Sequence, residues 1–243
     1  MKLSSEEVLS KLNIKNKNVS GILFGDFSFR LVHYKANFEV LDQKEIKGLY
    51  HLLQESFIHH IQSWTRKEPI ALKSGSLSVK EEKRYSDDAL REVLVNAVAH
   101  SSFEKHGGGI KVELYPDRIE ISNHCLQEEE AFINKRFPKD SFSPNIFLVK
   151  VLRMANFSEE LGTGKNKIFK YVIEDGKREP LFEYRKTSNN YGIWSVTLYN
   201  EKLNENLLNL FKSLKAQYGD RRDKNNKKKK VKVYLTKKRH TCR

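Results

Sequence analysis

The chain has 243 residues, of which 38% are hydrophobic, and a formal net charge of +14. This length and apolar content suffice for one large domain, or for one domain with an appendage. No apolar run approaches the length of a membrane span, and the N-terminal segment lacks the apolar stretch of a signal peptide, which argues against membrane-embedded and secreted classes.

Cysteine use and the distribution of charge narrow the class further. Cys125 and Cys242 are isolated, so they form neither a disulfide framework nor a zinc site, and we expect a cytoplasmic protein. Residues 221–243 hold twelve Lys or Arg and one acid, a net charge of +11, which leaves +3 for residues 1–220. The basic character therefore belongs to a C-terminal tail.

The N-terminal third of the chain predicts mixed secondary structure. In chain order we expect a short capped helix over 5–12, a buried strand over 21–25, a strand over 29–41, a long helix over 44–64 and a strand pair over 65–85. The long helix is expected because Ile46, Leu49, Leu53 and other apolar residues recur at helical spacing.

The stretch 86–123 predicts a capped helix, a glycine break and a hairpin. Ser86 or Asp87 suits the N-cap, and the apolar residues Leu90, Val93, Leu94, Ala97 and Val98 share one arc. Gly107 to Gly109 cannot continue a helix, and the residues from Ile110 to Ile121 alternate around a Pro-Asp turn as in a half-buried hairpin.

Three polar residues form a stripe beside the apolar arc of that helix. Glu92, Asn96 and His100 are spaced by four, and each step of four advances only about 40° around a helix. Glu92 could polarise a water molecule, and Asn96 could bind a magnesium ion that also contacts phosphates. A solvated helix face is the other interpretation of this spacing.

Beyond the hairpin we expect an irregular segment from Asn123 to Leu126 and a mobile loop, a candidate lid, over 127–143. Ser143 and Pro144 suit the cap and first position of a helix. A second amphipathic helix is expected over 166–174, with a stop at Gly176.

A glycine-rich loop, Leu161-Gly162-Thr163-Gly164-Lys165, precedes that second helix. Glycines let backbone amides approach a ligand closely, and a helix N-terminus offers unsatisfied N–H groups and a positive dipole end to phosphates. Thr163 and Lys165 could add a hydroxyl group and a cation. The other interpretation is a simple turn between two helices, and the glycine spacing excludes a Walker A loop.

The C-terminal part predicts a hairpin over 181–187 and 193–199, an amphipathic helix over 203–214 and the basic tail. The lysines of the tail could release counterions from a nucleic acid, which gives affinity without sequence readout. A disordered, solubilising end or a frameshifted end is the alternative.

The order of these motifs resembles a known family. The runs ALREVLVNAVAHSSF, GGIKVELYPDRIEISN, LGTGKNKI and LFEY are similar to the GHKL-type (Bergerat fold) ATPase domain of RecG-like, Schlafen/AlbA-associated transcriptional regulators. The similarity covers roughly residues 18 to 200. In that family the hairpin ends near Ile-Ser-Asn-Pro-Gly-Gly, whereas this chain has Asn123-His124-Cys125-Leu126.

The resemblance implies a two-layer α/β sandwich of Bergerat (GHKL/HATPase) type with a mixed sheet, plus a small N-terminal α+β connector. It implies three parts: residues 1–66 as a connector and remnant of an AlbA-type domain that is otherwise missing, 67–200 as the ATP-binding domain, and 201–243 as helix and tail. The cofactors implied are ATP and Mg²⁺.

The resemblance also assigns site residues. Glu92 would be the general base, Asn96 the magnesium ligand, and Asn123 the start of the loop that contacts adenine. Gly162, Thr163 and Gly164 would lie at the phosphates, with Lys165 beside them.

We therefore expect an ATP-binding regulatory protein with a GHKL-type site, capable of Mg-dependent ATP hydrolysis if the site is intact. The alternative is a nucleic-acid-binding module, acting on DNA or RNA through the tail, with a nucleotide site that no longer works. A third interpretation is an interaction scaffold that dimerises through the helix over 44–64.

Overall fold

The computed structural model describes seven ranges of the chain: 17–25, 27–64, 84–103, 109–127, 143–157, 164–187 and 191–218. The predicted helix over 5–12, most of the predicted strand pair over 65–85 and the basic tail lie outside these ranges, as do 128–142 of the candidate lid. Two compact units are distinguished, Met1–Lys202 and Leu203–Arg243.

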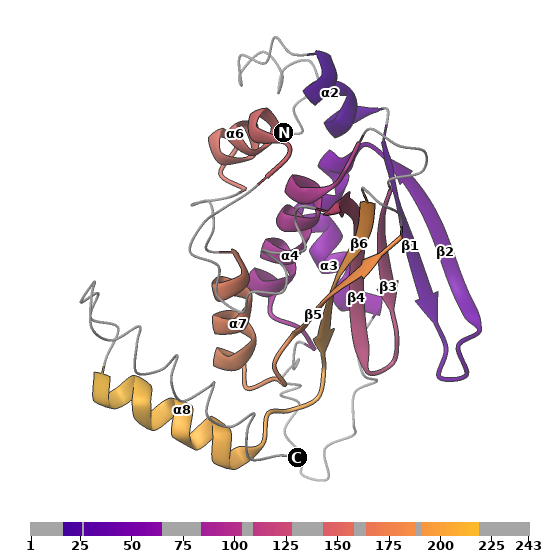
Figure 1. Ribbon diagram of the computed structural model, residues 1–243. Coiled ribbons are helices and arrows are strands. Elements are labelled where there is room, and N and C mark those ends of the chain that lie inside the picture. Colours follow the sequence, from indigo (N-terminus) through magenta and orange to yellow (C-terminus); the bar gives the residue numbers. More distant parts are fainter. Residues whose placement is uncertain are drawn as a thin grey trace. The chain divides into compact units, whose positions relative to one another are not determined.

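A six-stranded mixed sheet forms the frame of the first unit (Figure 1). Its strands are β1 (Ser28–Tyr34), β2 (Val40–Lys47), β3 (Ile110–Leu114), β4 (Arg118–Leu126), β5 (Leu181–Lys186) and β6 (Tyr191–Tyr199), in the spatial order β2-β1-β3-β4-β6-β5. The β1–β3 pair is parallel and all other pairs are antiparallel.

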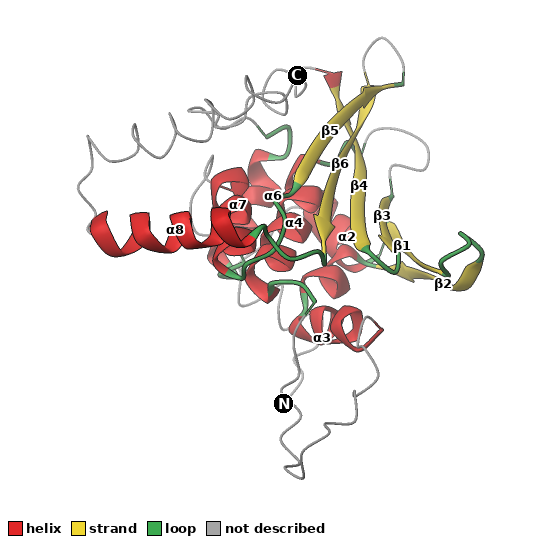
Figure 2. Cartoon of the chain, turned by 90° about the horizontal axis from the view of Figure 1, so that it is seen from below, coloured by secondary structure: helices red, strands yellow, loops and turns green. Residues whose placement is uncertain are grey.

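The described helices of this unit are α2 (Lys17–Phe24), α3 (Glu55–Trp64), α4 (Asp87–His100), α6 (Ile146–Met154) and α7 (Gly164–Glu174), and a 3₁₀ helix, η1, covers Leu49–Leu53. Helices α3, α4 and α7 lie on one face of the sheet (Figures 1 and 2). The chain is therefore an α/β protein, as expected. The second unit contains α8 (Glu205–Tyr218).

The core lies between α4 and the sheet. Alternate residues of the central strands point toward the helices and are fully buried, among them Leu31, Val112, Ile121 and Val196, which meet the buried arc of α4. Burial of this apolar surface is the main favourable term in folding. None of the helices in the described ranges is both long and apolar enough to cross a membrane.

Several local predictions are confirmed. Helix α4 begins after Ser86, whose Oγ accepts a hydrogen bond from the amide of Ala89, and its predicted apolar arc is buried. The β3–β4 and β5–β6 hairpins form as expected. Helix α7 ends at Gly176, whose φ of 66° requires a left-handed conformation that glycine adopts at low cost.

The predicted long helix over 44–64 is wrong. Residues Val40–Lys47 form the edge strand β2, and the helical part is divided into η1 and α3. Gly48 causes the break, because its φ of 84° is incompatible with a right-handed helix. The apolar residues on both sides of Gly48 matched a helical period only by coincidence.

Three shorter predictions also need correction. The predicted strand over 21–25 is part of helix α2, since an apolar run of five residues does not distinguish the two periods. The predicted irregular segment 123–126 continues strand β4, which pairs with β6 as far as Tyr191. The N-cap of α6 is Asn145 rather than Ser143.

Candidate functional site

The polar stripe predicted on α4 is present. Glu92, Asn96 and His100 are each half-buried, while the residues between them on the apolar arc are buried. Helix α4 packs along α7, which begins at Gly164 (Figure 1). The stripe therefore lies where two helices meet the inner face of the sheet, and not on a fully solvated surface.

Gly164 lies against the ends of two of these side chains. A Cβ atom at this position would come within 2.5 Å of Asn96 Nδ2 and 2.7 Å of Glu92 Oε1. Only a residue without a side chain allows this approach. The fold thus brings together three residues that were predicted separately, from the helix stripe and from the glycine-rich loop.

This arrangement has a defined chemical capacity. The first N–H groups of α7 have no partner within the helix and form the positive end of its dipole. A carboxylate and a carboxamide beside such a helix start suit an anion, a hard cation and a water molecule together. Within the described residues, no group of three or more His, Cys, Asp or Glu could hold a metal alone.

Asn123 is a polar residue on the buried face of the sheet. It alternates with the buried residues Ile121 and Cys125 on β4, and only 1% of its surface is exposed. Its Nδ2 donates to the carbonyl of His124 at 3.2 Å, while Oδ1 receives no hydrogen bond in the described structure. An unsatisfied buried acceptor costs about 1–3 kcal/mol, so this oxygen is suited to a ligand that donates a hydrogen bond.

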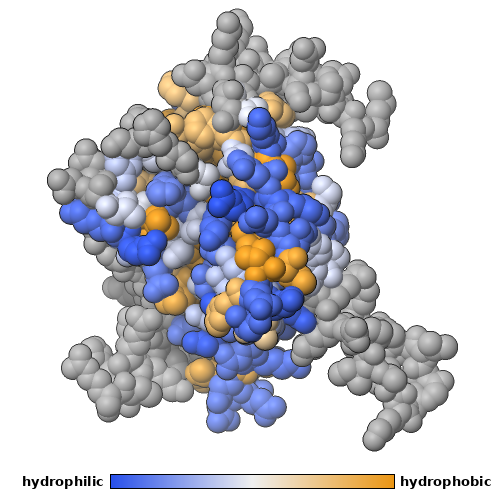
Figure 3. Space-filling view, turned by 90° about the vertical axis from the view of Figure 1, so that its right-hand side faces the viewer, coloured by the Kyte–Doolittle hydropathy of each residue, from blue (hydrophilic) through white to orange (hydrophobic). Residues whose placement is uncertain are grey.

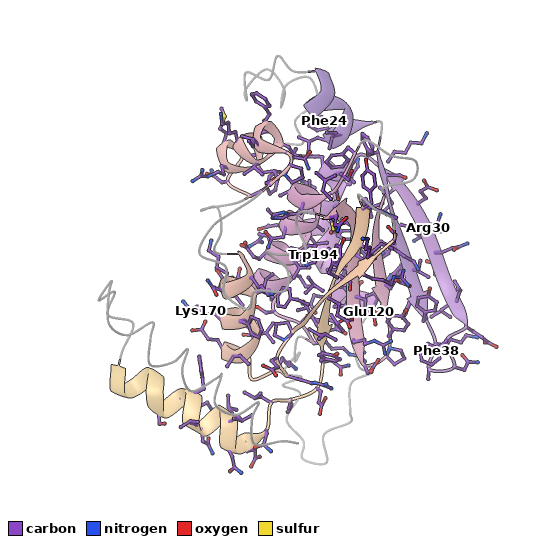
Figure 4. The ribbon with its side chains drawn as sticks, viewed as in Figure 1. Phe24, Arg30, Phe38, Glu120, Lys170 and Trp194 are labelled. Atoms are coloured by element: carbon purple, nitrogen blue, oxygen red, sulfur yellow. The ribbon has the colours of Figure 1, made fainter. Side chains whose placement is uncertain are left out.

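Aromatic groups line the same region. Trp194 of β6 lies directly opposite Asn123, and its ring centre is 6.2 Å from that of His100 (Figure 4). The amide of Ser102 donates to the carbonyl of His124 at 2.8 Å, which ties the end of α4 to β4. The stripe on α4 thus runs from Glu92 toward the aromatic surroundings of Asn123.

The remaining predicted site residues are placed as follows. Gly162 and Thr163 lie outside the described residues. Lys165 Nζ lies over the ring of Phe182 on β5, 4.6 Å from its centre, in a cation–π contact. The proposed contact of Lys165 with phosphates stays a prediction.

Asn145 is a residue of this region that the sequence did not reveal. Its Nδ2 donates to the carbonyls of Ala99 at 3.1 Å and Ser101 at 2.7 Å, and Ser143 Oγ donates to the same Ala99 carbonyl at 2.8 Å. These bonds satisfy carbonyls at the end of α4, which have no partner within the helix. An Asn at a helix start predicts a cap for its own helix and not for a distant one.

Comparison with known families gives a match for one part of the chain. Residues 107–190 match the family model HATPase_c_4, described as "Putative ATP-dependent DNA helicase recG C-terminal". This segment is of the HATPase_c_4 type. The match contains β3, β4, α6, α7 and β5, and so includes Asn123 and the glycine-rich loop, while α4 precedes it. The recognition made from the sequence is confirmed for these residues.

Comparison with whole proteins shows the fold alone. None of the curated proteins compared with the chain matches it. A crystal structure of the DIP2311 protein from Corynebacterium diphtheriae is similar, with a TM-score of 0.60 and 16% sequence identity. The similarity covers 87% of this chain and 44% of that protein, so this chain spans less than half the length of its structural relative.

Proposed function

We propose that the chain is a nucleotide-binding regulatory protein whose first unit binds Mg-ATP between α4, α7 and β4. The observation that carries the proposal is the contact of Gly164 with Glu92 and Asn96. The match to the HATPase_c_4 model supports it, because that family is named for ATP-dependent proteins.

The buried oxygen of Asn123 favours adenine over guanine. Its Nδ2 is engaged by the His124 carbonyl, which leaves an acceptor directed at the site. The exocyclic amine of adenine is a donor, whereas guanine presents a carbonyl oxygen at the corresponding position. The half-buried ring system of Trp194 and His100 supplies the apolar surroundings that a base requires.

The phosphates and the metal belong at the other end of the stripe. Asn96 would hold Mg²⁺ through Oδ1, and the backbone from Gly162 to Lys165 would contact phosphate oxygens. Bound Mg²⁺ would neutralise phosphate charge. Glu92 is placed to accept a proton from water, which makes slow ATP hydrolysis the expected reaction.

A nucleic-acid-binding module without a working nucleotide site is the second candidate. It is favoured by the net charge of +11 over residues 221–243, and by Cys125, a buried side chain on β4 where the related family has glycine. Deleting 219–243 would abolish salt-dependent retention of DNA or RNA and leave nucleotide binding unchanged, if the two activities reside in separate units. In either case we propose a cytoplasmic transcriptional regulator.

The proposal is tested by equilibrium titration with ATP and GTP, each with Mg²⁺ and with EDTA. We expect ATP to bind more tightly than GTP, and Asn96→Ala to weaken ATP binding about tenfold or more with Mg²⁺ but little in EDTA. Equal ATP binding by Asn96→Ala and the wild type in Mg²⁺ would contradict the assignment of Asn96.

A further inference from the structure

Strand β2 presents an open edge of the sheet. It pairs with β1 on one side, and no described strand pairs with its other side. Val40 and Leu41 are 51% and 55% exposed, an unusual amount for large apolar residues on a strand. Figure 3 views the molecule from this side and shows hydrophobic atoms among hydrophilic ones. Open edges of this kind are templates for pairing with another chain.

Charges of both signs lie along this strand. Asp42 and Lys44 share the face on which the helices lie, where their side chains form an ion pair at 3.6 Å. Glu45 and Lys47 lie on the opposite face. Charged residues normally protect an edge strand from pairing, but here their order makes the strand complementary to itself in one register.

Symmetry limits the registers that two copies can adopt. An antiparallel pair of identical strands related by a two-fold axis perpendicular to the sheet must be centred on a residue, because each residue keeps its face. Centring on Asp42 would place Asp42 opposite itself and Glu39 opposite Glu45. Centring on Lys44 would place two lysines opposite each other. Like charges directly opposite are destabilising.

Only centring on Gln43 removes these conflicts. Asp42 then lies opposite Lys44 of the second copy, and Val40 lies opposite Ile46. Beyond the strand, Glu39 lies opposite Lys47. By symmetry each of these pairs occurs twice, so the exposed apolar residue and both charges of the inner face find matching partners.

We propose that β2 is a dimerisation edge, and that two copies of this chain pair antiparallel through β2 around Gln43. The two six-stranded sheets then join into one continuous sheet with the helices of both copies on the same face. Backbone hydrogen bonds provide affinity, and the alternating charges fix the register. The partner is thus a second copy of the chain.

Charge reversal tests the proposal without disrupting the fold, since both residues are exposed on the edge. Lys44→Asp alone and Asp42→Lys alone each place like charges opposite one another, and we expect each to weaken dimerisation about tenfold or more. An equimolar mixture of the two variants restores every pair, so it should form a heterodimer as tight as the wild-type dimer. Sedimentation velocity over a concentration series measures all three.

Disulfide trapping reports the register. In a Cys242→Ser background, Gln43→Cys faces itself at the axis, where antiparallel Cα atoms are about 4.5–5.5 Å apart and a disulfide can form. Leu41→Cys should not link to itself but should link to Glu45→Cys. A wild-type chain that is monomeric at every concentration, or equal trapping at positions 41 and 43, would overturn the proposal.

Discussion

At the residue scale, the candidate site depends on the absence of a side chain at Gly164. The atoms that a Cβ would meet are the flexible ends of Glu92 and Asn96 and not backbone, so both side chains can move aside at little cost to folding. The same movement would take both groups away from the positions in which they serve a nucleotide. Stability and function should therefore separate at this position.

Gly164→Ala is expected to bind ATP about tenfold or more weakly. Its free energy of unfolding should change by less than about 1 kcal/mol, because the gain in helix propensity offsets the displaced side chains. Titration and urea unfolding measure the two effects. Gly25→Ala is the matched control, since nothing lies within 4 Å of its added Cβ, and it should leave both quantities unchanged. Unchanged ATP affinity in Gly164→Ala would be evidence against the site.

Asn123→Leu is expected to act in opposite directions on stability and binding. Leucine removes a buried acceptor that lacks a partner, so the unliganded protein should be unchanged or more stable by up to about 2 kcal/mol. The stabilisation by ATP should be lost, because nothing accepts the hydrogen bond of the base. Thermal unfolding with and without ATP measures both, and a variant that is less stable yet still responds to ATP would refute this role.

At the element scale, the site depends on contacts between elements distant in sequence. The sequence predicted α4 and its stripe because a cap and a helical period are local features. It could not reveal that α7 would begin against Asn96, or that Asn145 would satisfy the end of α4, because these contacts depend on packing. The helix predicted across Gly48 failed for a related reason, since a backbone angle there overrides the apolar spacing.

Asn145→Ala should lower the free energy of unfolding by about 1–3 kcal/mol, because two carbonyls at the end of α4 lose their donor. Asn145→Asp should be less stable than Asn145→Ala, since a carboxylate would face those carbonyls and the negative end of the helix dipole. Urea unfolding measures this order. Equal stability of the two variants would show that the carbonyls do not depend on Asn145.

The contact between α3 and the β1–β2 pair should make stability depend on pH. His33 stacks on Trp64 at 5.3 Å and His60 lies 4.4 Å from the same ring. Burial lowers the pKa of both histidines, helped at His33 by Arg84 and at His60 by Lys44, while Asp42 opposes the shift at both.

Because the folded-state pKa values lie below the ordinary value near 6.5, the unfolded chain binds these protons more readily. Stability should be complete above about pH 6.5 and fall as the pH drops through the lowered folded-state values. Urea unfolding between pH 8 and pH 5 measures this dependence. The double variant His33→Gln/His60→Gln should show a smaller loss over that interval, and an equal loss would assign the effect to other groups.

At the scale of the whole molecule, one sheet connects the candidate nucleotide site with the proposed dimer edge. Asn123 lies on β4, and the parallel β1–β3 pair joins that strand to β2 through hydrogen-bonded neighbours. The N-terminal strands are therefore part of the same sheet as the site. Sequence periodicity predicted most of these strands but not their spatial order, which depends on long-range pairing.

The most direct test of the central claim is thermal unfolding of the wild type and Asn96→Ala, with and without Mg-ATP. A ligand at 100 times its dissociation constant stabilises the folded state by about 2.7 kcal/mol, which raises Tm by several degrees. We predict this shift in the wild type and its loss in Asn96→Ala. No shift in the wild type at millimolar Mg-ATP, or an equal shift in Asn96→Ala, would contradict the assignment of these residues to a nucleotide site.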